Sequence, residues 1–232
     1  MNVKLVSYSK PSLEFEQDGL QNAQDLIAFC ARVSNPNNQM NTETSEKLIN
    51  YLVKHKHWSP LEMVSACLEI ETTRDIAHQI VRHRSFAFQE FSQRYANPIE
   101  DLSFASREFR LQDTKNRQNS IDLSESDMPE QERLELENQW RIRQDKVVLE
   151  SVKQYKWALK NGIAKEQARV VLPEGLTKTR LYMNGSLRSW VHYVELRGAN
   201  GTQKEHMEIA HACAKVIAEI FPLIQGYITD PG

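Results

Sequence analysis

Residues 82–94 hold the densest set of anion-binding side chains in the chain. The segment reads Arg-His-Arg-Ser-Phe-Ala-Phe-Gln-Glu-Phe-Ser-Gln-Arg, so three arginines and one histidine lie among three phenylalanines. A guanidinium carries five donors in a planar fork that matches the oxygens of a phosphate. We therefore predict a site for a phosphorylated ligand that bears a planar ring. An arginine-rich surface turn anchored by its phenylalanines is the alternative.

A helix should position this segment. Apolar residues recur at helical spacing between residues 76 and 80, behind two threonines that can cap the helix. The helix then ends close to Arg82. Because Arg82 and Arg84 are two residues apart, they should point in different directions, and one cluster could hold two ligands.

The order of several motifs along the chain resembles one enzyme family. Arg82-His83-Arg84, seven residues and then Ser92, followed by Arg94, is similar to the signature of the flavin-dependent thymidylate synthases. These enzymes methylate dUMP to dTMP with FAD, NADPH and methylenetetrahydrofolate. Further matching segments cover most of the chain from about residue 25 to about residue 220: Ala-Arg-Val-Ser at 31–34, His-Trp-Ser-Pro-Leu-Glu at 57–62, Ala-Arg-Val-Val-Leu-Pro at 168–173, Leu-Arg-Ser-Trp at 187–190 and Leu-Arg at 196–197.

The resemblance implies a role for each matching residue. Arg197 would be the catalytic residue, because the family uses an arginine to stabilise the ionised uracil ring while reduced flavin supplies electrons. The residues that would bind dUMP are Gln79, Arg82, Glu90, Ser92, Gln93, Arg94, Arg169 and Arg197. Those that would bind FAD are Ser34, Ser59, Arg82, His83, Arg84, Glu90, Ser186, Arg188 and His192. The chain departs from common family residues near the flavin at Ala87, Gln89, Ser186 and His192.

The cysteines fit a mechanism without a thiolate nucleophile. Cys30, Cys67 and Cys213 are far apart, and none has an arginine-rich neighbourhood that would favour the thiolate. Cys30 and Cys213 follow the apolar stripes of two predicted helices, which predicts that both are buried. Ser92 has no histidine and carboxylate partner at a recognisable spacing, so we assign it to binding. We expect no metal site, because the paired His55 and His57 lack further ligands.

Composition limits the other functions. With a formal net charge of −2 and a sequence pI of about 6.4, the chain has no overall basic field for nucleic acid or an anionic membrane. A single-strand nucleic-acid module, with the phenylalanines stacking on bases, is one alternative function. A tetrameric helical scaffold with a vestigial site is another. No apolar run approaches 18 residues, no secretion signal is expected, and the separated cysteines favour the cytoplasm.

The patterns predict an α+β fold with one domain over residues 1–232, in which long helices flank an antiparallel sheet. The resemblance implies a homotetramer with its sites at subunit interfaces. Residues 97–127 lack apolar periodicity and are predicted to form a surface excursion or lid. The predicted strands span about 3–7, 64–70 and 176–183, and the predicted helices about 20–31, 48–55, 129–161, 164–172, 187–197 and 209–220. The 129–161 helix is longer than a small core needs, which favours a shared interface.

Overall fold

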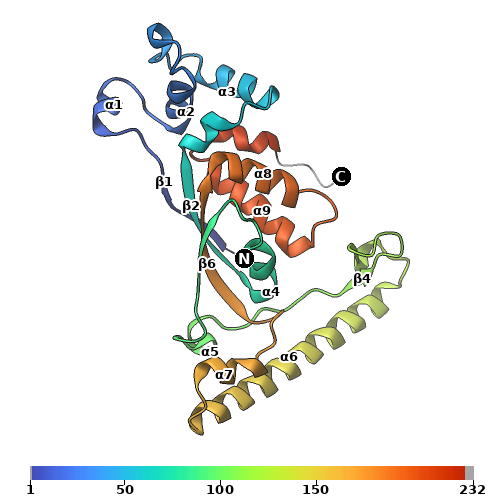
Figure 1. Ribbon diagram of the computed structural model, residues 1–232. Helices are drawn as coiled ribbons and strands as arrows, with labels where there is room; N and C mark the ends of the chain where they lie inside the picture. The colour runs from blue at the N-terminus through green and yellow to red at the C-terminus, as the bar shows by residue number, and fades with distance from the viewer. Residues whose placement is uncertain (1, 228–232) are drawn as a thin grey trace.

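The computed structural model describes residues 2–227, and a four-stranded antiparallel sheet with strand order β1-β2-β6-β3 forms its centre (Figure 1). The predicted α+β class is confirmed. The strands are β1 (Asn2–Tyr8), β2 (Ser65–Thr73), β3 (Ala87–Glu90), β4 (Arg110–Gln112), β5 (Ser120–Asp122) and β6 (Lys178–Ser186), of which β4 and β5 form a separate pair. The α-helices are α1 (Leu13–Gln17), α2 (Ala23–Ala31), α3 (Ser45–Lys54), α4 (Arg74–Ile80), α5 (Pro98–Asp101), α6 (Glu130–Lys160), α7 (Lys165–Ala168), α8 (Leu187–Arg197) and α9 (Lys204–Ile217). Short 3₁₀ turns include η2 (Ser59–Met63) and η4 (Arg169–Val171).

The sheet has one apolar face and one polar face. Leu68 of β2 lies opposite Met183 of β6, and both are buried against the helices. On the other face Glu69 accepts a hydrogen bond from Tyr182 at 2.9 Å. The alternation of apolar and polar residues along the strands therefore determines which face of the sheet the helices cover. Helices α4, α8 and α9 pack on that face (Figure 1).

Helix α8 joins the segment 82–94 to the core. The Ser186 side chain caps α8 by accepting from the backbone N–H of Ser189, as the sequence predicts. Ser189 Oγ in turn donates to the carbonyl of Ser85 at 3.2 Å. The Phe86 ring packs edge-on against the buried Trp190 at 4.8 Å between centroids. Strand β3, which the sequence analysis did not predict, continues this segment along the edge of β6.

Two predictions about α2 were wrong. The helix begins at Ala23 rather than near residue 20, because Asn22 accepts a hydrogen bond from the Asp25 backbone and starts the helix there. Cys30 is only partly buried, since the core face of this short helix is made by Ile27 and its neighbours. Cys213 on α9 is buried, as predicted.

The predicted excursion at 97–127, called the strap below, is held to the core by ion pairs and hydrogen bonds. Arg107 donates to Thr73 at 2.5 Å and pairs with Asp75 at 2.8 Å. Arg110, on β4, pairs with the buried Glu205 of α9. The strap is thereby fixed to the start of α4 and to the start of α9, so it is not a free lid.

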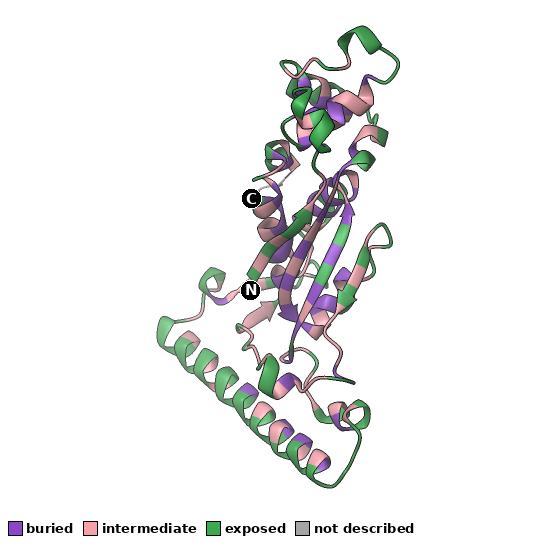
Figure 2. Cartoon of the chain, turned by 90° about the vertical axis from the view of Figure 1, so that its left-hand side faces the viewer, coloured by how far each residue is buried: buried purple, intermediate pink, exposed green. Residues whose placement is uncertain are grey.

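Helix α6 lies apart from the sheet, as Figures 1 and 2 show. Its 31 residues confirm the predicted long helix. Only Gln144, Ser151, Tyr155 and Ala158 of α6 are buried, whereas Leu149 is 70% exposed and Trp157 is 58% exposed. Most of the helix surface therefore has no cover within this chain. Among residues 2–227, no helix is both long and apolar enough to cross a bilayer.

The Phe86 contact gives a stability prediction. A Cβ at Gly185 would overlap the Phe86 ring, so Gly185→Ala must displace the ring or the strand. We expect a loss of about 1–3 kcal/mol in the free energy of unfolding, the usual range for an overpacked core. Urea unfolding measures it at fixed protein concentration. Gly226→Ala is the control, because a Cβ there meets nothing within 4 Å. Equal stability of both variants would contradict the packing argument.

Candidate active site

The predicted site residues fall into three groups according to the elements that carry them. The central group lies where α4 and α8 end and contains Gln79, Arg82, His83, Arg84 and Arg197. The second group, at the end of β3 and beside α7, contains Glu90, Ser92, Gln93, Arg94 and Arg169. The third, around η2 and α8, contains Ser59, Ser186, Arg188 and His192, with Ser34 exposed in the turn after α2.

A contact between Arg197 and His83 forms the central group. Arg197 Nε donates to His83 Nε2 at 2.9 Å, which requires an unprotonated imidazole nitrogen at that position. Burial, and then the charge of Arg197, lower the pKa of His83 to about 4. Tyr193 packs edge-on against the same imidazole at 4.9 Å between centroids. The Arg197 guanidinium is therefore held by a neutral partner and keeps its full charge.

Gln79 belongs to a buried polar network next to this contact. Its Nε2 donates to Gln203 Oε1 at 2.8 Å, and its Oε1 lies 3.2 Å from His206 Nδ1. His206 Nε2 lies 3.1 Å from the Tyr193 hydroxyl. Burial, and then the charges of Arg197 and His83, lower the pKa of His206 to about 3. His206 is fully buried, so both imidazoles in this part of the site are neutral at pH 7.

Two residues of the second group line a cavity of about 440 Å³. Gln93, which is buried, and Arg169 contribute to its wall. Glu90 does not point freely to a ligand, because it accepts from Arg74 at 3.1 Å and from Thr179 at 2.8 Å. Arg94 pairs with Glu166 at 3.0 Å, with both side chains largely in solvent. Such an exposed pair is weak, and a phosphate can compete for the guanidinium.

The third group presents an aromatic surface and a cation. The Trp58 ring lies 4.7 Å from the His192 ring, so η2 and α8 meet next to Ser59. Arg188 of α8 pairs with Glu62 of η2. Ser186 is already used as the cap of α8. The helix fixes the backbone of Ser186, and the Ser186 hydroxyl already accepts a hydrogen bond from the Ser189 backbone.

The donor set fits an anionic cofactor and a nucleotide. Within residues 2–227, the guanidinium groups of Arg82, Arg84 and Arg169 make no hydrogen bond or ion pair. Arg82 and Arg84 are both exposed on the turn after α4. Unpaired guanidiniums beside a neutral, preorganised pocket are the donors that phosphate groups need. The residues present therefore fit a bound dinucleotide such as FAD.

The three thiols do not suit nucleophilic attack. Burial raises the pKa of Cys30, of Cys67 and of Cys213. A raised pKa disfavours the thiolate, which is the reactive form. The directions of these pKa shifts therefore do not favour a cysteine nucleophile.

Comparisons with known proteins show the family of the chain. The family model described as "Thymidylate synthase complementing protein" matches residues 17–223. A protein of Paramecium bursaria Chlorella virus 1 named "Probable flavin-dependent thymidylate synthase" is 46% identical over 224 residues, 97% of each chain. The chain belongs to the flavin-dependent thymidylate synthase family. A member from Synechocystis sp. named "Flavin-dependent thymidylate synthase" is also 46% identical, over 225 residues and 97% of each chain.

A solved structure supports the fold independently. The UMP/dUMP methylase PolB from Streptomyces cacaoi, crystallised with 5-Br dUMP, superposes with a TM-score of 0.73 at 22% identity. The match covers 97% of this chain and 93% of that one. The family model and the two relatives confirm the family resemblance and the enzyme class, a flavin-dependent methyltransferase, and the nucleic-acid module and the scaffold are set aside.

The sequence analysis missed the residues that support Gln79. Gln203, Glu205 and His206 were not predicted as part of the site. A signal was present, because Glu205 lies four residues before Ile209, and His206 three, so both lie on the core face of the helix. Polar residues on an apolar stripe indicate a buried polar site.

The neutral histidines give a pH prediction. Both imidazoles stay neutral in the folded chain, while each takes up a proton near pH 6.5 when the chain unfolds. The free energy of unfolding should therefore fall as the pH drops from about 6.5 to about 4.5, because the unfolded state binds more protons. His206→Gln removes one of the two imidazoles that take up a proton on unfolding. The slope of the free energy of unfolding against pH should therefore fall to roughly half over that range. Urea unfolding at several pH values measures the slope, and parallel curves for the two proteins would contradict the assignment.

Proposed function

We propose that the chain catalyses the reductive methylation of dUMP to dTMP. Methylenetetrahydrofolate would donate the carbon, NADPH would reduce the bound FAD, and no cysteine would attack the pyrimidine. Membership of the family supports this reaction. The observation that carries it is the Arg197 guanidinium held by a neutral imidazole at a site where the thiols are disfavoured as thiolates.

Arg197 would activate the uracil ring electrostatically. A guanidinium has a pKa above about 12, so it cannot act as a general base, but it can stabilise negative charge that develops on the ring. One of its donors is used by His83, which fixes the direction of the planar group. The other donors can face the substrate. Bound FAD would supply the electrons for the reduction.

The second group would bind the nucleotide phosphate. Arg82, Arg94 and Arg169, with Ser92 and Gln93, would surround the phosphate next to the cavity beside α7. Arg94 would exchange its exposed partner Glu166 for the phosphate. Glu90, which is held by Arg74 and Thr179, would contribute from a fixed position.

Residues from all three groups would hold FAD. Arg82, His83, Arg84 and Glu90 would bind it from the turn after α4, and Ser34, Ser59, Ser186, Arg188 and His192 from the far end. The side chains of Arg188 and His192 are 43% and 47% exposed, which leaves both accessible to a cofactor. The Trp58 and His192 rings offer a planar surface there.

The assembly would be a homotetramer with its sites at subunit interfaces. The exposed apolar residues of α6, among them Leu149 and Trp157, favour cover by another copy of the chain. The 440 Å³ cavity beside α7 contains only Gln93 and Arg169 of the predicted site residues. A single domain over residues 1–232 and a cytoplasmic location remain predictions.

Absorbance and turnover test the proposal together. The purified protein should be yellow, with the spectrum of oxidised flavin, and should form dTMP from dUMP when methylenetetrahydrofolate and NADPH are supplied. Sedimentation of the same sample should show a tetramer. A colourless protein that cannot be loaded with FAD would overturn the proposed reaction, and an active monomer would overturn the proposed assembly alone.

Replacement of Arg197 tests activation separately from affinity. Arg197→Lys keeps the positive charge but loses the planar fork that His83 orients. Preorganised donors of this kind are worth about 10²–10³ in rate, so turnover should fall by about that factor. Single-turnover oxidation of the reduced flavin, with saturating dUMP and methylenetetrahydrofolate, measures the rate beside the dUMP dissociation constant. Weaker binding with an unchanged rate would show that Arg197 only binds.

A further inference from the structure

The hydrogen bonds around Gln79 form a chain whose direction is set at one end. Glu205 is an ionised carboxylate, which can only accept hydrogen bonds. Gln203 Nε2 donates to it at 2.9 Å, so Gln203 must turn its Oε1 towards Gln79. Gln79 must then present Nε2 to Gln203, at 2.8 Å, and its Oε1 to His206. The polarity of the Gln79 amide is therefore fixed by a charge two side chains away.

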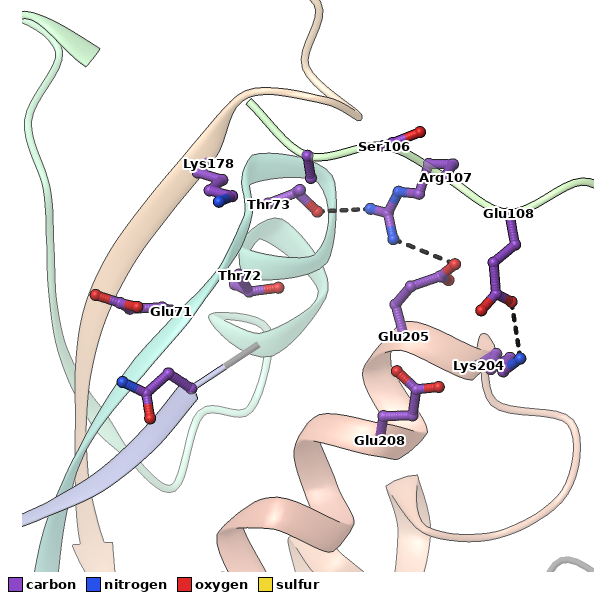
Figure 3. A pocket seen from close by; sticks show the side chains of 12 residues that line it. Glu71, Thr72, Thr73, Ser106, Arg107, Glu108, Lys178, Lys204, Glu205 and Glu208 are labelled. Atoms are coloured by element: carbon purple, nitrogen blue, oxygen red, sulfur yellow. Dashed lines mark hydrogen bonds and ion pairs between the residues drawn. The ribbon is translucent and has the colours of Figure 1, made fainter. Parts of the chain in front are cut away.

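The strap holds that charge in place. Arg110 donates to Glu205 Oε1, and Arg107 lies 3.3 Å from the same oxygen. Figure 3 shows Arg107 reaching from the strap to both Thr73 and Glu205. Burial opposes ionisation of Glu205, but hydrogen bonds from Arg110, from its own backbone and from Gln203, together with the charge of Arg107, lower its pKa to about 2. The carboxylate thus stays charged over the whole physiological range.

His206 closes the other end of the chain. Because Gln79 Oε1 is an acceptor, His206 Nδ1 must carry the proton, and its Nε2 must accept from the Tyr193 hydroxyl at 3.1 Å. Burial of His206 keeps this neutral tautomer. A flip of the Gln79 amide would set oxygen against oxygen at Gln203, whose own orientation is fixed by Glu205. This mismatch leaves polar atoms unpaired. His206 can follow either orientation of Gln79 by exchanging tautomers, because the Tyr193 hydroxyl can donate or accept.

The fixed amide leaves one donor and one acceptor unused. Gln79 Nε2 carries a second hydrogen, and Oε1 carries a second lone pair. Uracil presents an N3–H donor next to the C4 carbonyl, whereas cytosine presents a bare N3 next to a C4 amino group. An amide of this polarity can pair with both uracil groups, but it opposes donor with donor and acceptor with acceptor on cytosine. An amide that was free to flip would accept either base.

We propose that Gln203 and Glu205 determine base specificity by locking the Gln79 amide in the orientation that pairs with uracil and rejects cytosine. The inference rests on the proposed function, in which Gln79 contacts dUMP. Gln203 and Glu205 are positioning residues that act through Gln79. The strap residues Arg107 and Arg110 support them by keeping the carboxylate charged and fixed.

Binding of two nucleotides to the FAD-loaded enzyme tests the proposal. Calorimetry gives the dissociation constants of dUMP and dCMP for the wild type and for Gln203→Met, which removes both amide partners but keeps the side-chain length. The wild type should prefer dUMP. In Gln203→Met the ratio of the dCMP constant to the dUMP constant should fall at least tenfold, because dUMP binding weakens while dCMP binding stays constant or improves. A purely structural defect would weaken both nucleotides by the same factor and leave the ratio unchanged.

A second variant and a control complete the test. In Glu205→Gln the new amide oxygen should face Arg110 and Arg107, so its NH2 group faces Gln203 and reverses the polarity of the chain up to Gln79. This variant should therefore lower the ratio in the same direction even if Gln203→Met does not fold. Glu208→Gln removes an exposed carboxylate three residues further along α9, and should leave the ratio at its wild-type value (Figure 3). An unchanged ratio in Gln203→Met or Glu205→Gln would overturn the proposal while leaving the reaction intact. A wild type that binds neither nucleotide would overturn the proposed function and this inference with it.

Discussion

The buried carboxylate of Glu205 is the charge on which the polar half of the core depends. A carboxylate at 8% exposure is costly unless hydrogen bonds and opposite charges compensate it, and two arginines from the strap do so here. The same ion fixes Gln203 and, through it, Gln79. One desolvated charge therefore fastens the segment 97–127, orders the start of α9 and orients a predicted substrate contact at the end of α4. Loss of either arginine would leave the buried carboxylate with one cation in place of two, so the strap and the Gln79 network are structurally coupled.

The arrangement of the sheet explains why the site is open in one chain. Helices α4, α8 and α9 cover only one face, and the other face carries pairs such as Glu71 with Arg180 at 3.0 Å. The segment that carries Arg82 and Arg84 runs along the edge of the sheet, through β3. Groups at a sheet edge with one bare face are accessible to ligands and to other subunits alike. The long exposed α6 offers apolar surface in the same chain, which supports an assembly in which neighbouring copies complete the site.

Much of this organisation could be predicted from local patterns, and the misses have physical causes. The alternation through β2 and the stripe Leu187, Trp190, Val191 and Val194 of α8 reflect burial on one face, which a sequence records directly. The strand β3 was missed because it is four residues long and its pairing with β6 depends on contacts distant in the sequence. The partners of Glu90 and Arg94 could not be predicted from local patterns either, because Arg74, Thr179 and Glu166 come from separate elements. The residue types indicated the chemistry, but only the folded structure shows which of these side chains already have hydrogen-bond or ion-pair partners.

The arginines differ in the charge of the group that orients them, and this difference supports the proposed role of Arg197. Arg94, Arg107, Arg110 and Arg188 all face carboxylates, which orient them but cancel much of their charge. Arg197 is oriented by His83, a neutral acceptor whose imidazole is kept unprotonated by burial and by the guanidinium itself. A neutral partner fixes the geometry of the cation without neutralising it, so the full charge remains for a developing anion. Protonation of His83 would remove the acceptor and repel the guanidinium, and its low pKa prevents this throughout the neutral range. The pairing of the half-buried Arg197 with an imidazole, in place of a carboxylate, is therefore consistent with the proposed electrostatic mechanism.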